Sequence, residues 1–127
     1  MDIKTSKSIN TDILHENLKK VFGFNNFRGK QEEIILNLLA GNDSMVIMPT
    51  GGGKSICFQI PSLTQQGICI VISPLVALMT DQVKSLQQKG IKALAITGGK
   101  SFTEVNTLLD NASFGNYKFL YLSPERL

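Results

Sequence analysis

The chain is poor in the residues that build disulfide frameworks and metal centres. Its 127 residues include only two cysteines and one histidine. Cys57 and Cys69 lie inside apolar runs and have no C-x-x-C spacing, so we expect two reduced, buried thiols in a cytosolic protein. His15 has no second ligand near it in the sequence, and we expect a solvated helix residue there.

Long apolar segments are also missing. No apolar run approaches the roughly 18 residues that a membrane-spanning helix needs, and residues 1–7 lack the apolar segment of a secretory signal. We therefore expect a protein that is neither secreted nor membrane-embedded. The formal net charge of +3 is a mild basic bias, which is compatible with a nucleic-acid partner but does not require one.

Short apolar runs alternate with helical patterns along the rest of the chain. The run at 68–72 is apolar at every position, which favours a strand covered on both faces in a parallel sheet flanked by helices. We expect one doubly wound α/β domain over residues 10–127, after a frayed polar segment 1–9. The apolar runs predict strands at 45–48, 68–72, 91–96 and 119–122, and the helical patterns predict helices at 10–22, 31–40, from 54 onward, 75–89 and 101–110.

Glycines and caps mark several of these boundaries. Gly23 and Gly41 are expected to end the first two helices. Ser101 and Glu104 match a capping box that starts the last long helix. Residues 111–116 are expected to form a loop, and the buried stripe of the preceding helix is expected to comprise Phe102, Val105, Leu108 and Leu109.

A glycine-rich turn between a predicted strand and a predicted helix is the main functional signal. The strand is 45–48, the turn ends in Gly51-Gly52-Gly53, and Lys54-Ser55 opens the helix. Backbone N–H groups of such a loop and helix start bind phosphate oxygens, a lysine reaches the β- and γ-phosphates, and a serine hydroxyl coordinates Mg²⁺. Met48 stands where the strict P-loop pattern has its first glycine. The alternative is a flexible glycine loop with an exposed lysine.

Four stretches, in order, resemble motifs of RecQ-family DNA helicases, which belong to superfamily 2. The resemblance runs from about Leu14 to Leu127, and superfamily 2 helicases share the departure at Met48. It implies a RecA-like P-loop domain. The stretches are Phe-Gly-Phe-Asn-Asn-Phe-Arg-Gly-Lys-Gln at 22–31 (motif 0), residues 48–55 (motif I), residues 73–83 (motif Ia), and Tyr-Leu-Ser-Pro-Glu-Arg-Leu at 121–127, which resembles the segment ahead of the D-E-x-H motif.

The resemblance implies ATP and Mg²⁺ as cofactors. Phe24 would stack on adenine, Arg28 would lie beside the nucleotide, and Gln31 would read the hydrogen-bonding edge of the base. Their alternatives are core packing for Phe24, a surface ion pair for Arg28 and a solvated helix start for Gln31. Gly29-Lys30 replaces the family's frequent Pro-Gly. The implied phosphate-binding residues are Thr50, Gly51, Gly52, Gly53, Lys54 and Ser55, with Lys54 and Ser55 catalytic and Ser55 on the metal.

The family also implies contacts with single-stranded or duplex-junction DNA. Loops at the carboxyl ends of parallel strands are the expected place for them, with phosphate contacts from backbone N–H groups, hydroxyls and Lys84. The alternative is that Ser73-Pro74 only ends a strand and caps a helix. The implied DNA-facing residues are Ser73, Pro74, Leu75, Gln82, Thr97 and Gly98.

No Asp-Glu-x-His sequence occurs within these 127 residues, and they do not include a second RecA-like lobe. We therefore expect an N-terminal fragment of an ATP-dependent 3′-to-5′ helicase that acts in the cytoplasm or nucleoid, or in the nucleus of a eukaryote. Such a fragment should hydrolyse ATP very slowly, because the group that orients the attacking water is missing. An unfinished sheet should also leave a strand edge uncovered and prone to self-association.

Two other classes of protein remain open. A small-molecule kinase would explain the glycine loop but not the upstream trio of Phe24, Arg28 and Gln31. A non-catalytic nucleotide-binding or interaction module is the second alternative, and it gains weight if 127 residues is the natural length. The coding sequence beyond Leu127 distinguishes this module from a helicase fragment.

Overall fold

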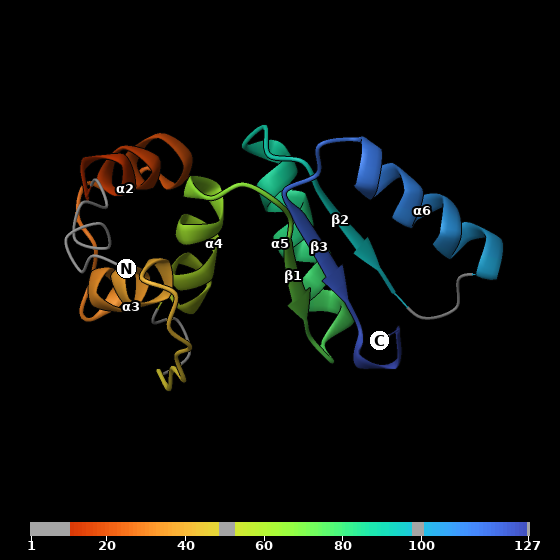
Figure 1. Ribbon diagram of the computed structural model, residues 1–127, viewed down its shortest axis with the longest axis horizontal. Helices are drawn as coiled ribbons and strands as arrows, with labels where there is room; N and C mark the ends of the chain where they lie inside the picture. The colour runs from red at the N-terminus through yellow and green to blue at the C-terminus, as the bar shows by residue number, and fades with distance from the viewer. Residues whose placement is uncertain (1–10, 49–52, 98–100, 127) are drawn as a thin grey trace. The chain divides into compact units, whose positions relative to one another are not determined.

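The computed structural model describes residues 11–48, 53–97 and 101–126 (Figure 1). The chain divides into two compact units, Met1–Gln66 and Gly67–Leu127, and each is described by itself. None of the described helices is long and apolar enough to cross a bilayer.

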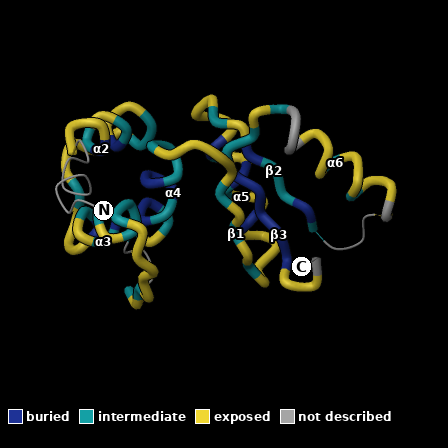
Figure 2. Tube along the Cα trace, viewed as in Figure 1, coloured by how far each residue is buried: buried dark blue, intermediate teal, exposed yellow. Residues whose placement is uncertain are grey.

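The first unit is helical. Its elements are α2 (Thr11–Asn17), the π-helix η1 (Leu18–Phe22), α3 (Gln31–Leu39) and α4 (Lys54–Thr64). Gly23 ends the first helical stretch as predicted: its N–H donates to the carbonyl oxygens of Leu18 and Lys19, and its φ of 78° turns the following chain out of the helix. The helices α2, η1, α3 and α4 together bury one apolar cluster, made of Leu14, Leu18, Ile35, Ile56 and Ile60 (Figure 2).

The prediction of a strand at Met45–Met48 is wrong. Residues 42–48 have no regular secondary structure, and Met45 and Ile47 are each 90% exposed. A strand exists only where a neighbouring strand takes up its backbone N–H and C=O groups. The described residues of the first unit contain no second strand, so this apolar run lacks a partner there.

The second unit is an α/β layer structure, as the alternating pattern predicts. Its described residues form a three-stranded parallel sheet in the order β1-β3-β2, in which Ile72, Leu122 and Ile96 are in register. The predicted strands at 68–72, 91–96 and 119–122 are confirmed, the first two with shorter bounds. The elements are β1 (Cys69–Ile72), α5 (Val76–Gln88), β2 (Ala93–Ile96), α6 (Phe102–Phe114), β3 (Phe119–Leu122) and the 3-10 turn η2 (Pro124–Arg126).

Helices cover both faces of the central strand β3. Leu120 and Leu122 pack with Ile96 against Val105 and Leu108 of α6. Side chains alternate along a strand, and on the other face the hydroxyl of Tyr121 donates to Gln82 of α5, at 2.8 Å. All four residues of β3 are accordingly buried.

The edge strand β1 departs from the prediction of cover on both faces. Ile70 is 58% and Ile72 41% exposed. The reason is the reach of α6, whose Val105 and Leu108 pack against the cluster formed by β2 and β3. A continuous apolar run therefore predicted the strand correctly and its burial incorrectly.

The predicted start of α6 is confirmed, and its predicted end is wrong. The Ser101 hydroxyl accepts the Glu104 N–H at 3.1 Å, as a capping box requires. The helix continues through residues 111–114, which were predicted as loop, and ends where the Gly115 N–H donates to the carbonyl oxygen of Asn111 at 2.7 Å. Val105 and Leu108 are partly buried as expected, but Leu109 is 39% exposed, and the side chain of Phe102 lies outside the described part of the structure.

Candidate functional site

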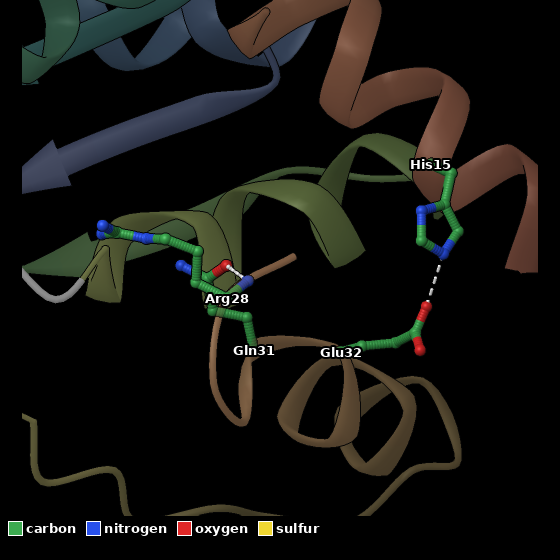
Figure 3. Close-up of polar contacts among 4 residues, drawn as sticks. All are labelled: His15, Arg28, Gln31 and Glu32. Carbon is green, nitrogen blue, oxygen red and sulfur yellow. Dashed lines mark hydrogen bonds and ion pairs between the residues drawn. The ribbon is translucent and has the colours of Figure 1, made fainter. Parts of the chain in front are cut away.

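Gln31 links the loop before α3 to the glycine turn before α4. Its side chain is buried, with 2% exposure. Its Oε1 accepts the backbone N–H of Arg28 at 2.8 Å (Figure 3), and its Nε2 donates to the carbonyl oxygen of Gly53 at 3.2 Å. The alternative of a solvated residue at a helix start is therefore excluded.

Gly53 has a backbone conformation and a neighbour that both require glycine. Its φ of 77° and ψ of 35° lie in the left-handed region, where it caps the start of α4. A Cβ at this position would overlap Nε2 of Gln31 and would lie 3.6 Å from Nη2 of Arg28. The predicted nucleotide residues Arg28, Gln31 and Gly53 therefore meet at one place, although they come from three segments.

Lys54 and Ser55 open α4 directly after Gly53. Lys54 is exposed and Ser55 is half-buried. The first turn contains no acidic side chain, so the positive end of the helix dipole and its first backbone N–H groups are not offset by a local carboxylate. This chemistry suits a phosphate group. Thr50, Gly51 and Gly52, the other predicted phosphate-binding residues, lie outside the described residues.

Phe24 is 53% exposed, so the alternative that its ring belongs to the core is excluded. An exposed aromatic face suits stacking on a planar base, and that role stays a prediction. The exposed ring and the buried amide of Gln31 belong to the same segment that leads into α3.

His15 is more than a solvated helix residue. Its Nε2 lies 2.6 Å from Oε2 of Glu32 in the first turn of α3 (Figure 3). Its ring also meets Phe27 edge-on, with centroids 5.0 Å apart. These contacts tie α2 to the start of α3 and to the loop before it. Sequence inspection missed the pair because 17 positions separate the two residues.

The two cysteines have different surroundings, and both are free thiols. Cys57 lies within α4 and is 4% exposed, and this burial raises the pKa of its thiol. Cys69 is only partly buried, so the prediction of two buried thiols holds for one of them. Across the described ranges, no group of three or more metal-binding side chains gathers.

Three hydroxyl residues lie at the carboxyl edge of the sheet in the second unit. Ser73, Ser123 and Thr97 directly follow Ile72, Leu122 and Ile96, which are in register across β1, β3 and β2. The Ser73 N–H donates to Leu122 at 3.0 Å, and its Oγ accepts the Leu75 N–H at 3.2 Å. Ser73 thus shapes the turn into α5, as the alternative to DNA contact proposed. The two roles are compatible.

The predicted DNA-facing residues differ in their exposure to solvent. Pro74 and Leu75 are exposed, with Leu75 at 60%. The carbonyl oxygen of the Gln82 side chain instead accepts a hydrogen bond from Tyr121 inside the unit. Gly98 lies outside the described residues. Ser123 belongs to the stretch 121–127 that resembles a family motif, and its Oγ is buried without a hydrogen-bond partner in the described part of the chain.

Comparison with known proteins identifies the family. A model of the DEAD/DEAH box helicases matches residues 28–127. Proteins named ATP-dependent DNA helicase RecQ are 47% identical in Pasteurella multocida (91% of this chain, 18% of the relative), 46% in Synechocystis sp. (90% and 24%) and 48% in Bacillus subtilis (87% and 19%). The chain spans about a fifth of the length of these relatives. It therefore belongs to the DEAD/DEAH box helicase family, and its sequence is of the RecQ type.

Proposed function

We propose that this chain is the ATP-binding part of an ATP-dependent 3′-to-5′ DNA helicase. The observation that carries the proposal is the convergence of Arg28, Gln31 and Gly53 directly before Lys54 and Ser55. In this assignment Lys54 holds the β- and γ-phosphates, and Ser55 coordinates Mg²⁺. The relatives carry the name of ATP-dependent DNA helicases, which supports the same assignment.

Gln31 is suited to recognise adenine. A glutamine amide has two N–H donors and two acceptor lone pairs, and the contacts with Arg28 and Gly53 use one of each. The remaining donor and acceptor match the edge of adenine, which also presents one of each. Because the side chain is buried, base contact requires a local shift of the preceding loop. Phe24 supplies an exposed ring for the face of the base.

Nucleotide titration with matched variants tests the site. We expect Lys54→Ala to weaken Mg²⁺-ATP binding at least about tenfold, because a charge-assisted phosphate contact contributes about 1.5–3 kcal/mol. Lys20→Ala removes an exposed lysine from η1 of the same unit and should leave affinity unchanged. Gln31→Ala should reduce the preference for ATP over GTP. Equal affinity of wild type and Lys54→Ala would remove Lys54 from the phosphate role and defeat the proposal.

We propose that the second unit supplies part of the DNA contact. Ser73 and Thr97 follow β1 and β2, the two strands that flank β3, and Pro74 and Leu75 are exposed just before α5. Hydroxyls and backbone N–H groups of this kind contact phosphates of single-stranded or junction DNA.

Hydrolysis of ATP by the 127-residue chain should be very slow, because it contains no Asp-Glu-x-His sequence. DNA-stimulated hydrolysis at helicase-like rates would contradict this expectation.

A further inference from the structure

Side-chain hydrogen bonds join α5 to the sheet at two of its glutamines. The Tyr121 hydroxyl donates to Gln82 Oε1 at 2.8 Å, and Gln87 Nε2 donates to the carbonyl oxygen of Ala93 at 3.0 Å. The residues that α5 buries are apolar, namely Met79, Val83 and Leu86. Apolar burial has no preferred direction, whereas a hydrogen bond requires a defined distance and angle. The two polar contacts therefore fix the rotation of α5 and its position along its axis.

The Tyr121 contact holds α5 at its midpoint. Gln82 lies about 9 Å along the axis from Val76 and the same distance from Gln88, at 1.5 Å per residue, whereas Gln87 is near the carboxyl end of the helix. Tyr121 is 1% exposed in the central strand, two residues before Ser123. Its hydroxyl thus links the interior of the sheet to the helix that begins directly after Ser73, Pro74 and Leu75.

We infer that Tyr121 and Gln82 are positioning residues for the DNA-facing strand ends. They hold the first turn of α5 level with Ser73 and Ser123, so that backbone N–H groups and hydroxyls meet successive phosphates. Neither side chain touches DNA in this role, which replaces a direct DNA contact by Gln82. The inference rests on the proposed DNA contact of the second unit.

Salt-dependent DNA binding by the full chain tests the inference. Tyr121→Phe removes only the hydroxyl, and Tyr117→Phe is the control, since that ring lies over Lys92 at the other end of the sheet. We expect Tyr121→Phe to weaken binding of a labelled single-stranded oligonucleotide about three- to tenfold, the range that one net hydrogen bond contributes. The slope of log Kd against log salt concentration should become shallower, because fewer phosphates are contacted.

A purely structural role for the hydroxyl gives a different result. Partial unfolding lowers the fraction of active protein but keeps the Kd and the salt slope of the folded molecules, and that outcome would overturn the inference. Gln82→Met removes the acceptor of the same bond, so Tyr121→Phe/Gln82→Met should bind no more weakly than either single variant. Additive losses, or a much larger loss for Gln82→Met than for Tyr121→Phe, would also overturn it.

Amide hydrogen exchange without DNA separates the inference from the proposed function. In Tyr121→Phe, exchange should become faster at residues 79–82 than at 86–88, which the Gln87 contact still holds. Uniform acceleration, or none, refutes the positioning role even if the wild type binds DNA. If the wild type binds no DNA, the proposed DNA contact fails, whatever the exchange pattern shows.

Discussion

The side-chain amide of Gln31 occupies the space that any side chain at position 53 would need. Its Nε2 donates to the carbonyl oxygen of Gly53, and a Cβ added at Gly53 would overlap the same nitrogen. The last glycine of the P-loop is therefore required by a neighbouring protein group as well as by its left-handed backbone. This contact joins the loop that carries the predicted base-reading residues to the loop that carries the phosphate site.

We predict that Gly53→Ala is more destabilising than Gly41→Ala. Both glycines have positive φ, 77° and 91°, so each substitution carries a backbone cost of about 1–3 kcal/mol. Position 41 has open space around its missing Cβ, whereas position 53 has the Gln31 amide. Urea unfolding should show the excess cost at position 53, and this excess should vanish in a Gln31→Ala background. An excess that persists there would show that the overlap has no effect.

We predict opposite outcomes for two serine substitutions in the second unit. Ser101→Ala removes the cap of α6 and should lower the free energy of unfolding by about 1 kcal/mol. Ser123→Ala should leave it unchanged within about 0.5 kcal/mol, or raise it, because its buried hydroxyl has no hydrogen-bond partner in the described part of the chain. Thermal and urea unfolding measure both values. A loss at Ser123→Ala as large as that at Ser101→Ala would mean that the hydroxyl has a partner.

We predict that Cys69 reacts with iodoacetamide before Cys57 in the native protein. Burial raises the pKa of the Cys57 thiol, so the folded state holds this proton to higher pH than the unfolded state does. At pH values below the pKa of this thiol in the unfolded chain, its ionisation does not affect the free energy of unfolding. As the pH rises through that pKa, the thiol ionises more readily in the unfolded state, and the free energy of unfolding falls. Mass spectrometry after timed labelling checks the order, and Cys57→Ala should reduce the loss of stability at alkaline pH. Faster labelling of Cys57 would contradict the raised pKa.

We predict that the open edge of β1 causes self-association. Cys69 and Ser73 donate their N–H groups to the carbonyl oxygens of Lys118 and Leu122, so the backbone groups of Ile70 point toward the other edge of β1, which no described strand pairs with. Ile70→Lys should reduce self-association in sedimentation velocity experiments at little cost to stability, since this side chain is 58% exposed. Leu109→Lys, which changes an exposed residue of α6, should not. A wild-type protein that stays monomeric at all concentrations would refute the prediction.

Local patterns predicted most element types and several boundaries correctly. The structure confirms three of the four predicted strands, the helix end at Gly23 and the helix cap at Ser101. Each of these predictions used only residues that are close together in the sequence. The motif at residues 53–55 and the upstream residues Arg28 and Gln31 indicated one site, and the structure brings these segments into contact. Stacking by Phe24, phosphate binding by Lys54 and DNA contact by Ser73 stay predictions.

The sequence by itself determined the family, the alternation of helices and strands, and the residue types of the nucleotide site, because these depend on short-range spacing and composition. Only the tertiary structure decided which apolar runs find a partner. The run at 45–48 finds no strand partner among the described residues of its own unit, and the Ile70 face of β1 is exposed, because strand pairing and burial depend on segments far away in the chain. The Gln31–Gly53, His15–Glu32 and Gln82–Tyr121 contacts join residues 17 to 39 positions apart, so no local pattern could predict them.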